Sequence, residues 1–174
     1  MVLLFTGFHR DTVPSDMLGV FYRVGQRHAV LVDLSCRSDI TIWYGVYNNS
    51  TRELTYASGG HPPALFYDGT YTDGSNATFL RTANKAIGAM PDVIYEKSKH
   101  LVDEQAKLYI LSDGVYEVEK SDGSMWQFKE FSDFMAKIKT DGRSALDRLY
   151  QHALNLGDAD KFEADFTIVE VAFG

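Results

Sequence analysis

Three short segments combine small residues with side chains that can carry chemistry. They are ASGGHPP at residues 57–63, LSDGVYE at 111–117 and EADFT at 163–167. Each adjoins an apolar run, and side chains at the end of a strand can face a cleft, so His61, Asp113 and Asp165 are candidates for a functional site. Taken one at a time, all three segments are also typical of turns and capped loops, because glycine, proline and aspartate favour tight turns.

The residues between these segments predict mostly β-strands, because runs of β-branched and aromatic residues are bounded by glycine, asparagine or proline. Strands are expected at residues 19–24, 28–34, 40–47, 53–58, 64–67, 93–101, 107–112 and 166–173, with a loop over 68–77 and a turn at 87–88. The first two strands flank residues 25–27 and predict a hairpin. In the third, residues 40, 42, 44 and 46 share one face.

Helical spacing occurs late in the chain. Apolar residues recur at three- and four-residue steps from Phe128 to Ile138 and again from Leu146 to Leu154. A break at residues 140–142 separates two amphipathic helices, whose aromatic residues are expected in the core. Antiparallel strands followed by a helical pair and a last strand predict an α+β fold in a single domain over residues 1–174.

Composition argues against several classes of protein. With 17 Lys and Arg against 24 Asp and Glu, the formal net charge is −7, which is the wrong sign for a general binder of nucleic acid or of an anionic membrane. Cys36 is the only cysteine, so neither an internal disulfide nor a cysteine-based metal cluster is expected. The apolar run MVLLF at residues 1–5 is too short for a signal peptide or a membrane span. We therefore expect a cytoplasmic protein.

The order of the motifs along the chain is more informative than any one of them. Along the chain come VLVDL at 30–34, TIWYG at 41–45, LTYASGGHPP at 54–63, IG at 87–88, LSDGVYE at 111–117 and DFTIV at 165–169. From about residue 15 to residue 171, this pattern resembles the SpoIIE/RsbU-type branch of the metal-dependent (PPM, protein phosphatase 2C-like) serine/threonine phosphatases. The resemblance implies a β-sandwich flanked by helices.

The resemblance also implies a metal site. In the family, two Mn²⁺ or Mg²⁺ ions at the strand ends activate a bridging water that attacks a phosphoserine of a partner protein. Two such ions about 3.5–4 Å apart need several carboxylates to offset their charge. By the resemblance, Asp33 and Asp113 match acidic ligand positions. Val20 stands at the position of the bridging aspartate, and Ala164 stands at the C-terminal acidic position.

Compensation would require acidic residues from neighbouring positions. Asp16, Glu163 and Asp165 are the candidates, and a shift of register would align Asp16 with the bridging position. Otherwise two carboxylates cannot hold two dications as a fixed pair, and Arg23 adds a positive charge beside them. We therefore expect no assigned catalytic residue and no bound metal in a degenerate, phosphatase-like output domain of bacterial signalling. It would regulate a partner protein, either a phosphoprotein or a sigma-factor regulator, in a partner-switching or stress-response pathway.

Two other interpretations stay open. The first is an active Mn²⁺- or Mg²⁺-dependent protein serine/threonine phosphatase that dephosphorylates an anti-anti-sigma-type phosphoprotein. The second is a structural module without a site, in which Asp33 and Asp113 would lie far apart.

The chain is short for the family in one place. In the family a pair of long helices follows the strand that carries Asp33, whereas here residues 35–40 (SCRSDI) lead almost directly into the next strand. Either the helical pair is missing or shortened, with the sheet covered by a partner or by a second copy in a homodimer, or a segment between residues 35 and 40 is absent from the sequence.

Overall fold

The computed structural model describes residues 2–8, 23–24, 27–28, 40–68, 77–138, 144–157 and 166–174, and up to residue 40 it describes the backbone only. The elements are β1 (Val2–Phe8), β2 (Arg23–Val24), β3 (Arg27–His28), β4 (Ile40–Asn48), β5 (Glu53–Gly59), β6 (Ala64–Tyr67), β7 (Thr78–Leu80), β8 (Ser98–Leu101), β9 (Lys107–Leu111), the 3-10 turn η1 (Asp113–Val115), β10 (Val118–Glu119), β11 (Met125–Trp126), α1 (Phe128–Lys137), α2 (Ala145–Leu156) and β12 (Ile168–Ala172). The α+β class expected from the sequence is confirmed.

Eight of these strands form two four-stranded antiparallel sheets. The first sheet has the order β1-β4-β5-β8 and the second has the order β12-β9-β6-β7. Trp43 and Leu54 of the first sheet share one apolar cluster with Phe66 and Ile110 of the second, and burial of such side chains holds a sandwich together. The indole Nε1–H of Trp43 also donates a hydrogen bond to the carbonyl of Leu80, 3.0 Å away, which joins the two sheets directly.

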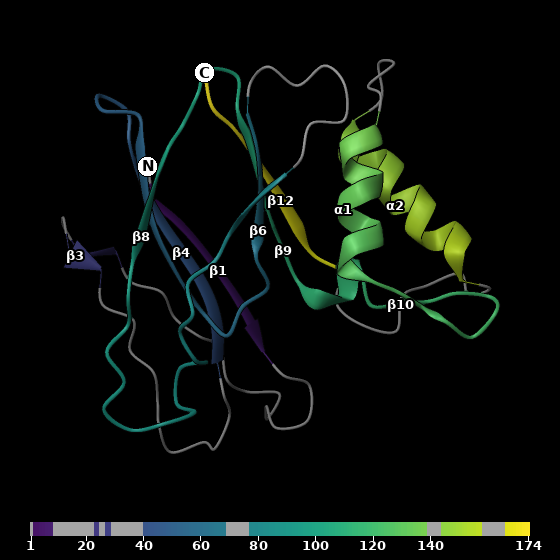
Figure 1. Ribbon diagram of the computed structural model, residues 1–174, viewed down its shortest axis with the longest axis horizontal. Helices are drawn as coiled ribbons and strands as arrows, with labels where there is room; N and C mark the ends of the chain where they lie inside the picture. The colour runs from purple at the N-terminus through teal and green to yellow at the C-terminus, as the bar shows by residue number, and fades with distance from the viewer. Residues whose placement is uncertain are drawn as a thin grey trace.

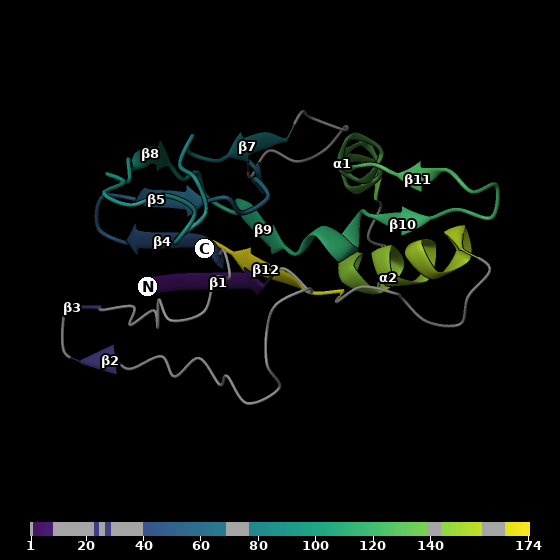
Figure 2. The ribbon, with the colours of Figure 1, turned by 90° about the horizontal axis from the view of Figure 1, so that it is seen from below.

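The two helices cover the other face of the second sheet. Figure 1 shows α1 and α2 beside β6, β9 and β12, on the side away from β4 and β8, and Figure 2 shows the same order of layers. Leu65 and Leu111 pack there against Phe131 and Leu149 of the helices. All four residues of β6 are therefore buried, because one face of the strand meets the first sheet and the other meets the helices.

Both helices begin and end close to the predicted positions. At the start of α1, Gln127 and Glu130 form a reciprocal capping box, and at the start of α2 the hydroxyl of Ser144 accepts a hydrogen bond from the N–H of Leu146 at 3.2 Å. These bonds satisfy N–H groups that have no partner within the helix. No helix in the described ranges is long and apolar enough to cross a membrane.

Two predictions about strands were wrong. The apolar run at the start of the chain was given no strand, but it forms β1, which pairs with β4 from Val2 opposite Val46 to Phe8 opposite Ile40. The strand expected over residues 93–101 is limited to β8, and residues 93–97 belong to an irregular loop. In both cases the outcome depends on contacts with distant parts of the chain, which local patterns do not contain.

The side of β4 that faces the core is not the side that carries residues 40, 42, 44 and 46 but the opposite one. Trp43 and Tyr47 are in the buried cluster, whereas Val46 is exposed. The glycine of the TIWYG motif has a packing reason, because a Cβ at Gly45 would lie 2.6 Å from Cζ3 of the Trp43 ring. The predicted hairpin is present where β2 pairs with β3, although Arg27 belongs to a strand rather than to the turn. The junction at residues 35–39 lies outside the described residues.

Candidate functional site

Asp113 lies where β9 ends, as the first residue of η1, with its side chain exposed. Its carboxylate Oδ1 accepts a hydrogen bond from the N–H of Gly114 at 2.9 Å. Its carbonyl accepts two more, from the N–H groups of Tyr116 at 3.0 Å and Glu117 at 2.9 Å. These bonds stabilise the tight turn at the S-D-G motif, which follows the buried strand. They hold Asp113 at the edge of the second sheet where β9 ends.

Ser112 ties this turn to the beginning of the last strand. The N–H of Ser112 donates to the carbonyl of Thr167 at 2.9 Å, and the N–H of Thr167 donates back to the Ser112 hydroxyl at 3.1 Å. The hydroxyl also lies 3.3 Å from the Thr167 carbonyl, to which it donates. Two of the three sequence motifs, separated by about fifty residues, are therefore joined at their backbones beside Asp113.

The third motif forms a corner between β5 and β6, which we call the glycine corner (residues 59–61). Gly60 has a φ of +65°, and its N–H donates to the carbonyl of Asn84 at 3.2 Å. A Cβ at Gly60 would lie 2.8 Å from the Cβ of Ala86, so only glycine allows both this conformation and this close approach. The corner is also bridged to Ile42 at the start of β4. It directs His61 into the interior.

His61 is 7% exposed, and its Nδ1–H donates to the carbonyl of Pro62 at 2.9 Å. Burial lowers the pKa of His61 below its usual value, while the Pro62 carbonyl and the negative charge of Asp113 oppose this shift. Because β6 and β9 pair antiparallel, with Leu65 opposite Tyr109, the glycine corner before β6 and the S-D-G turn after β9 lie at the same edge of the second sheet. The sequence motifs around His61, Asp113 and Thr167 thus converge, although they are far apart in the chain.

Tyr116 lies in the same turn as Asp113, to whose carbonyl its N–H donates. Burial raises its pKa to about 12, and the charges of Glu117 and Asp113 contribute in the same direction. Its ring packs edge-on against Phe128, with ring centres 5.1 Å apart. The phenol is therefore neutral at physiological pH.

The other residues predicted for a metal site cannot be placed. Asp16, Asp33, Glu163 and Asp165 lie outside the described residues, as do Val20 and Ala164. In the described ranges, no group of three or more His, Cys, Asp or Glu side chains is arranged to hold a metal ion. Of the predicted ligands, the structure places Asp113 alone, so the metal site stays a prediction.

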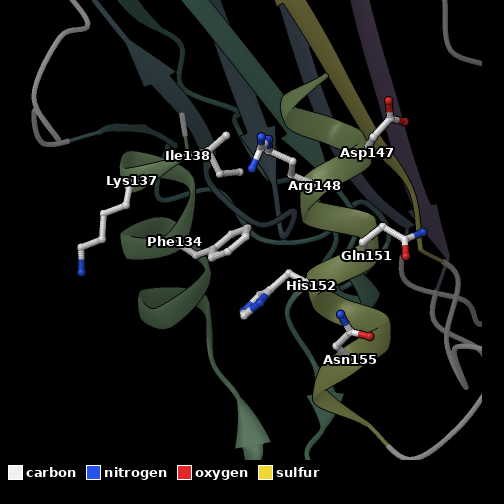
Figure 3. Close-up of a pocket in the computed structure, with 8 residues that line it drawn as sticks. All are labelled: Phe134, Lys137, Ile138, Asp147, Arg148, Gln151, His152 and Asn155. Atoms are coloured by element: carbon white, nitrogen blue, oxygen red, sulfur yellow. The ribbon is translucent and has the colours of Figure 1, made fainter. Parts of the chain in front are cut away.

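A separate groove lies between the two helices, with a volume of about 490 Å³. Figure 3 shows Phe134 of α1 and His152 of α2 next to each other among the side chains that line it. Their rings are stacked, with centres 4.0 Å apart, and the ring of Trp126 lies edge-on to His152. The residues that line the groove do not include Asp113 or His61. This groove is therefore distinct from the place where the motifs converge.

The sequence profile of the family described as "Stage II sporulation protein E (SpoIIE)" matches residues 13–173. The chain belongs to the SpoIIE family. The resemblance expected from the motifs is thus confirmed over nearly the whole chain. Phosphoserine phosphatase RsbU of Bacillus subtilis is 28% identical over 171 residues, which cover 94% of this SpoIIE-family chain and 45% of RsbU.

Solved structures show the same fold. The SiaA-PP2C domain of Pseudomonas aeruginosa superposes with a TM-score of 0.66 at 16% identity, covering 79% of this chain and 53% of that one. The RsbU and RsbW domains of a Mycobacterium tuberculosis protein give 0.57 at 19% identity, covering 77% and 36%. The SpoIIE-family chain thus has the PP2C-type fold, a β-sandwich flanked by helices, of which the described residues contain α1 and α2. It spans about half the length, or less, of these relatives.

Some residues that build the site were not singled out from the sequence. Ser112 was treated as part of a turn signal, and Thr167 only as part of a strand, although their mutual hydrogen bonds join the motifs. Asn84 and Thr82, which hold the glycine corner, had no signal at all, because a lone asparagine or threonine in a loop is ordinary. The repeated pairing of small polar residues with backbone groups becomes visible only in the folded chain.

Proposed function

We propose that this SpoIIE-family chain is a PP2C-type output domain that regulates a partner protein by binding it, without two-metal hydrolysis. The observation that carries the proposal is that the hydrogen-bonded segments of the site are present while two of the expected acidic residues are replaced. The frame around Asp113 and His61 is present, with the Ser112–Thr167 bonds in place. By the family pattern, however, Val20 and Ala164 stand where two of the expected carboxylates belong. A site that keeps these segments but lacks two of the metal-binding carboxylates can bind a partner protein but cannot hold the two metal ions that hydrolysis needs.

The proposed partner is a phosphoprotein or a regulator of sigma factors in a bacterial partner-switching pathway. RsbU is named a phosphoserine phosphatase, and one structural relative carries RsbU and RsbW domains in a single protein. A domain with the same fold would present its site to proteins of the same kind. Without bound metal, direct contact of Asp113 with a phosphate or an acidic side chain would be repulsive, so we expect the partner surface beside this acid to be polar or basic.

A second candidate is an active phosphatase that depends on Mn²⁺ or Mg²⁺, favoured by the exposed carboxylate of Asp113 at the point of convergence. Asp33, Asp113, Asp16 and Asp165 would hold the metals, which would supply an activated water at neutral pH. The chain's own contribution would be to fix Asp113 through the Gly114 N–H and to hold the adjoining segments through Ser112. The donor chemistry fits hard dications, because all four side chains are carboxylates.

Two measurements separate the candidates. The first is isothermal titration of the purified chain with Mn²⁺. The second is release of phosphate from a serine-phosphorylated anti-anti-sigma-type protein with Mn²⁺ present. For the regulatory domain we expect no release of phosphate and no pair of tightly bound Mn²⁺ ions. Tight binding of two ions, with turnover that Asp113→Asn abolishes and the exposed control Asp103→Asn leaves intact, would overturn our proposal and establish the phosphatase.

A further inference from the structure

The loop over residues 84–96, between β7 and β8, is closed by its own end residues. The side chain of Asn84 donates through Nδ2–H to the carbonyl of Glu96 at 2.8 Å and accepts at Oδ1 from the N–H of Glu96 at 2.9 Å. Further in, the hydroxyl of Tyr95 donates to the carbonyl of Ala86 at 3.3 Å. The loop leads into β8 in Figure 1. Compact loops with bonded ends are frequently functional surfaces.

The backbone inside the loop is shaped by defined turns. The N–H of Ala89 donates to the carbonyl of Ala86 at 3.3 Å, and Gly88 between them has a φ of +90°. Asp92 also has a positive φ, of 56°, a conformation that aspartate tolerates better than most residues. The predicted turn at residues 87–88 is thus present, and hydrogen bonds hold the two ends of the loop, at residues 84–89 and 95–96.

The same loop is fastened to the glycine corner. Besides the bond from Gly60 to the Asn84 carbonyl, several hydrogen bonds join Ser58 and Thr82. The Ser58 N–H donates to the Thr82 hydroxyl at 2.9 Å, the Thr82 N–H donates to the Ser58 hydroxyl at 2.8 Å, and the Thr82 hydroxyl donates to the Ser58 carbonyl at 2.8 Å. Asn84 Nδ2–H also donates to the Thr82 hydroxyl at 2.8 Å. The loop and the corner that carries His61 are therefore one polar-bonded unit.

This fixed loop exposes large apolar side chains. Met90 is 58% exposed, Ile94 is 88% exposed and Tyr95 is 41% exposed, all within six residues. Single exposed apolar residues are ordinary, but a group of them on a pre-ordered loop is typical of a recognition surface. Because hydrogen bonds hold both ends of the loop, a partner that covers these side chains would spend less binding energy on ordering the loop backbone.

We propose that loop 84–96 is a docking surface for the partner protein that the Asp113–His61 site engages, with Met90 and Ile94 as the apolar anchors. The inference rests on the proposed function, and it adds a second surface of this chain that the same partner contacts. Its occupant is a folded protein with an apolar patch beside the segment that enters the site, because the loop is continuous with the glycine corner. The flanking charges of Lys85, Asp92 and Glu96 are mixed, so apolar contact rather than net charge selects the partner.

The test uses the full chain and a panel of purified, serine-phosphorylated anti-anti-sigma-type proteins, with affinity measured by isothermal titration. Met90→Asp and Ile94→Asp should each weaken binding about tenfold or more, as expected for anchor residues at an interface. Met125→Asp is the matched control, because Met125 is 46% exposed on β11, away from the loop. It should leave affinity within about twofold of the starting value.

Each outcome bears on a distinct claim. If the chain binds a member of the panel and the loop variants bind it equally well, the docking surface is wrong and the proposed function stands. If the unaltered chain binds no member, the proposed function fails, and the docking surface fails with it. If sedimentation shows a dimer that Ile94→Asp converts to a monomer, the occupant is a second copy, which also overturns the inference.

Discussion

Gly60 offers a direct measure of how closely the glycine corner packs against loop 84–96. In Gly60→Ala, the new Cβ would meet the Cβ of Ala86 at 2.8 Å and its Cα at 2.9 Å, so part of the backbone must shift. The positive φ of +65° adds a conformational cost of about 1–2 kcal/mol for a residue with a side chain. Overpacking of this kind adds about 1–3 kcal/mol. We expect Gly60→Ala to lower the free energy of unfolding by about 2–5 kcal/mol.

The control is Gly123→Ala, which shares the conformational cost without the contact. Gly123 has a φ of +81°, and a Cβ there would meet no atom within 4 Å. Urea denaturation of both variants therefore separates strain from contact, and the difference between them should be about 1–3 kcal/mol. The double variant Gly60→Ala with Ala86→Gly should recover part of the loss, since it removes the nearer of the two contacting atoms. If Gly60→Ala and Gly123→Ala destabilise the fold equally, the close approach between corner and loop is not a real constraint.

Three further predictions concern other parts of the fold. Ser112→Ala removes the acceptor of the Thr167 N–H, so it should cost about 1 kcal/mol and speed hydrogen exchange at that amide, as followed by NMR. Trp43→Phe leaves the Leu80 carbonyl without its indole donor and should cost about 2 kcal/mol in urea denaturation; an unchanged midpoint would contradict this. Burial lowers the pKa of His152 in the folded chain, so the unfolded chain binds the proton more readily. Stability should therefore fall as pH drops below 6.5. His152→Asn should make the profile of unfolding free energy against pH less steep between 5 and 7, while His61, whose pKa burial also lowers, keeps part of the slope.

Much of the fold could be predicted because its signals are local. The apolar spacing from Phe128 to Ile138 defines α1 without knowledge of any partner, and the short apolar run that ends at Leu111 defines a buried strand. β1 could not be found in this way, since MVLLF becomes a strand only by pairing with β4. The loop at residues 93–97 reads as strand by composition, but the bonds between Asn84 and Glu96 hold it in another conformation.

The candidate site, too, has parts that local sequence signals predict and parts that depend on the assembled fold. The glycine and proline beside Asp113 and His61 mark turns in the sequence, and the antiparallel pairing of β6 with β9 brings these turns to the same edge of the sheet. The Ser112–Thr167 bonds were not predicted, because serine and threonine form such bonds in every conformational class and their partners are set by the assembled sheets.

The bonds between Ser112 and Thr167 have a topological consequence. They join the two ends of the segment from residue 112 to residue 167, which contains both helices. These ends therefore lie side by side next to Asp113. Lengthening a closed loop costs little, because the entropy of closure grows only with the logarithm of its length. This helical segment can therefore gain or lose residues without moving the acid, provided that it still covers Leu65 and Leu111. For descendants of this chain, the helical layer is the part of the domain that is free to diversify.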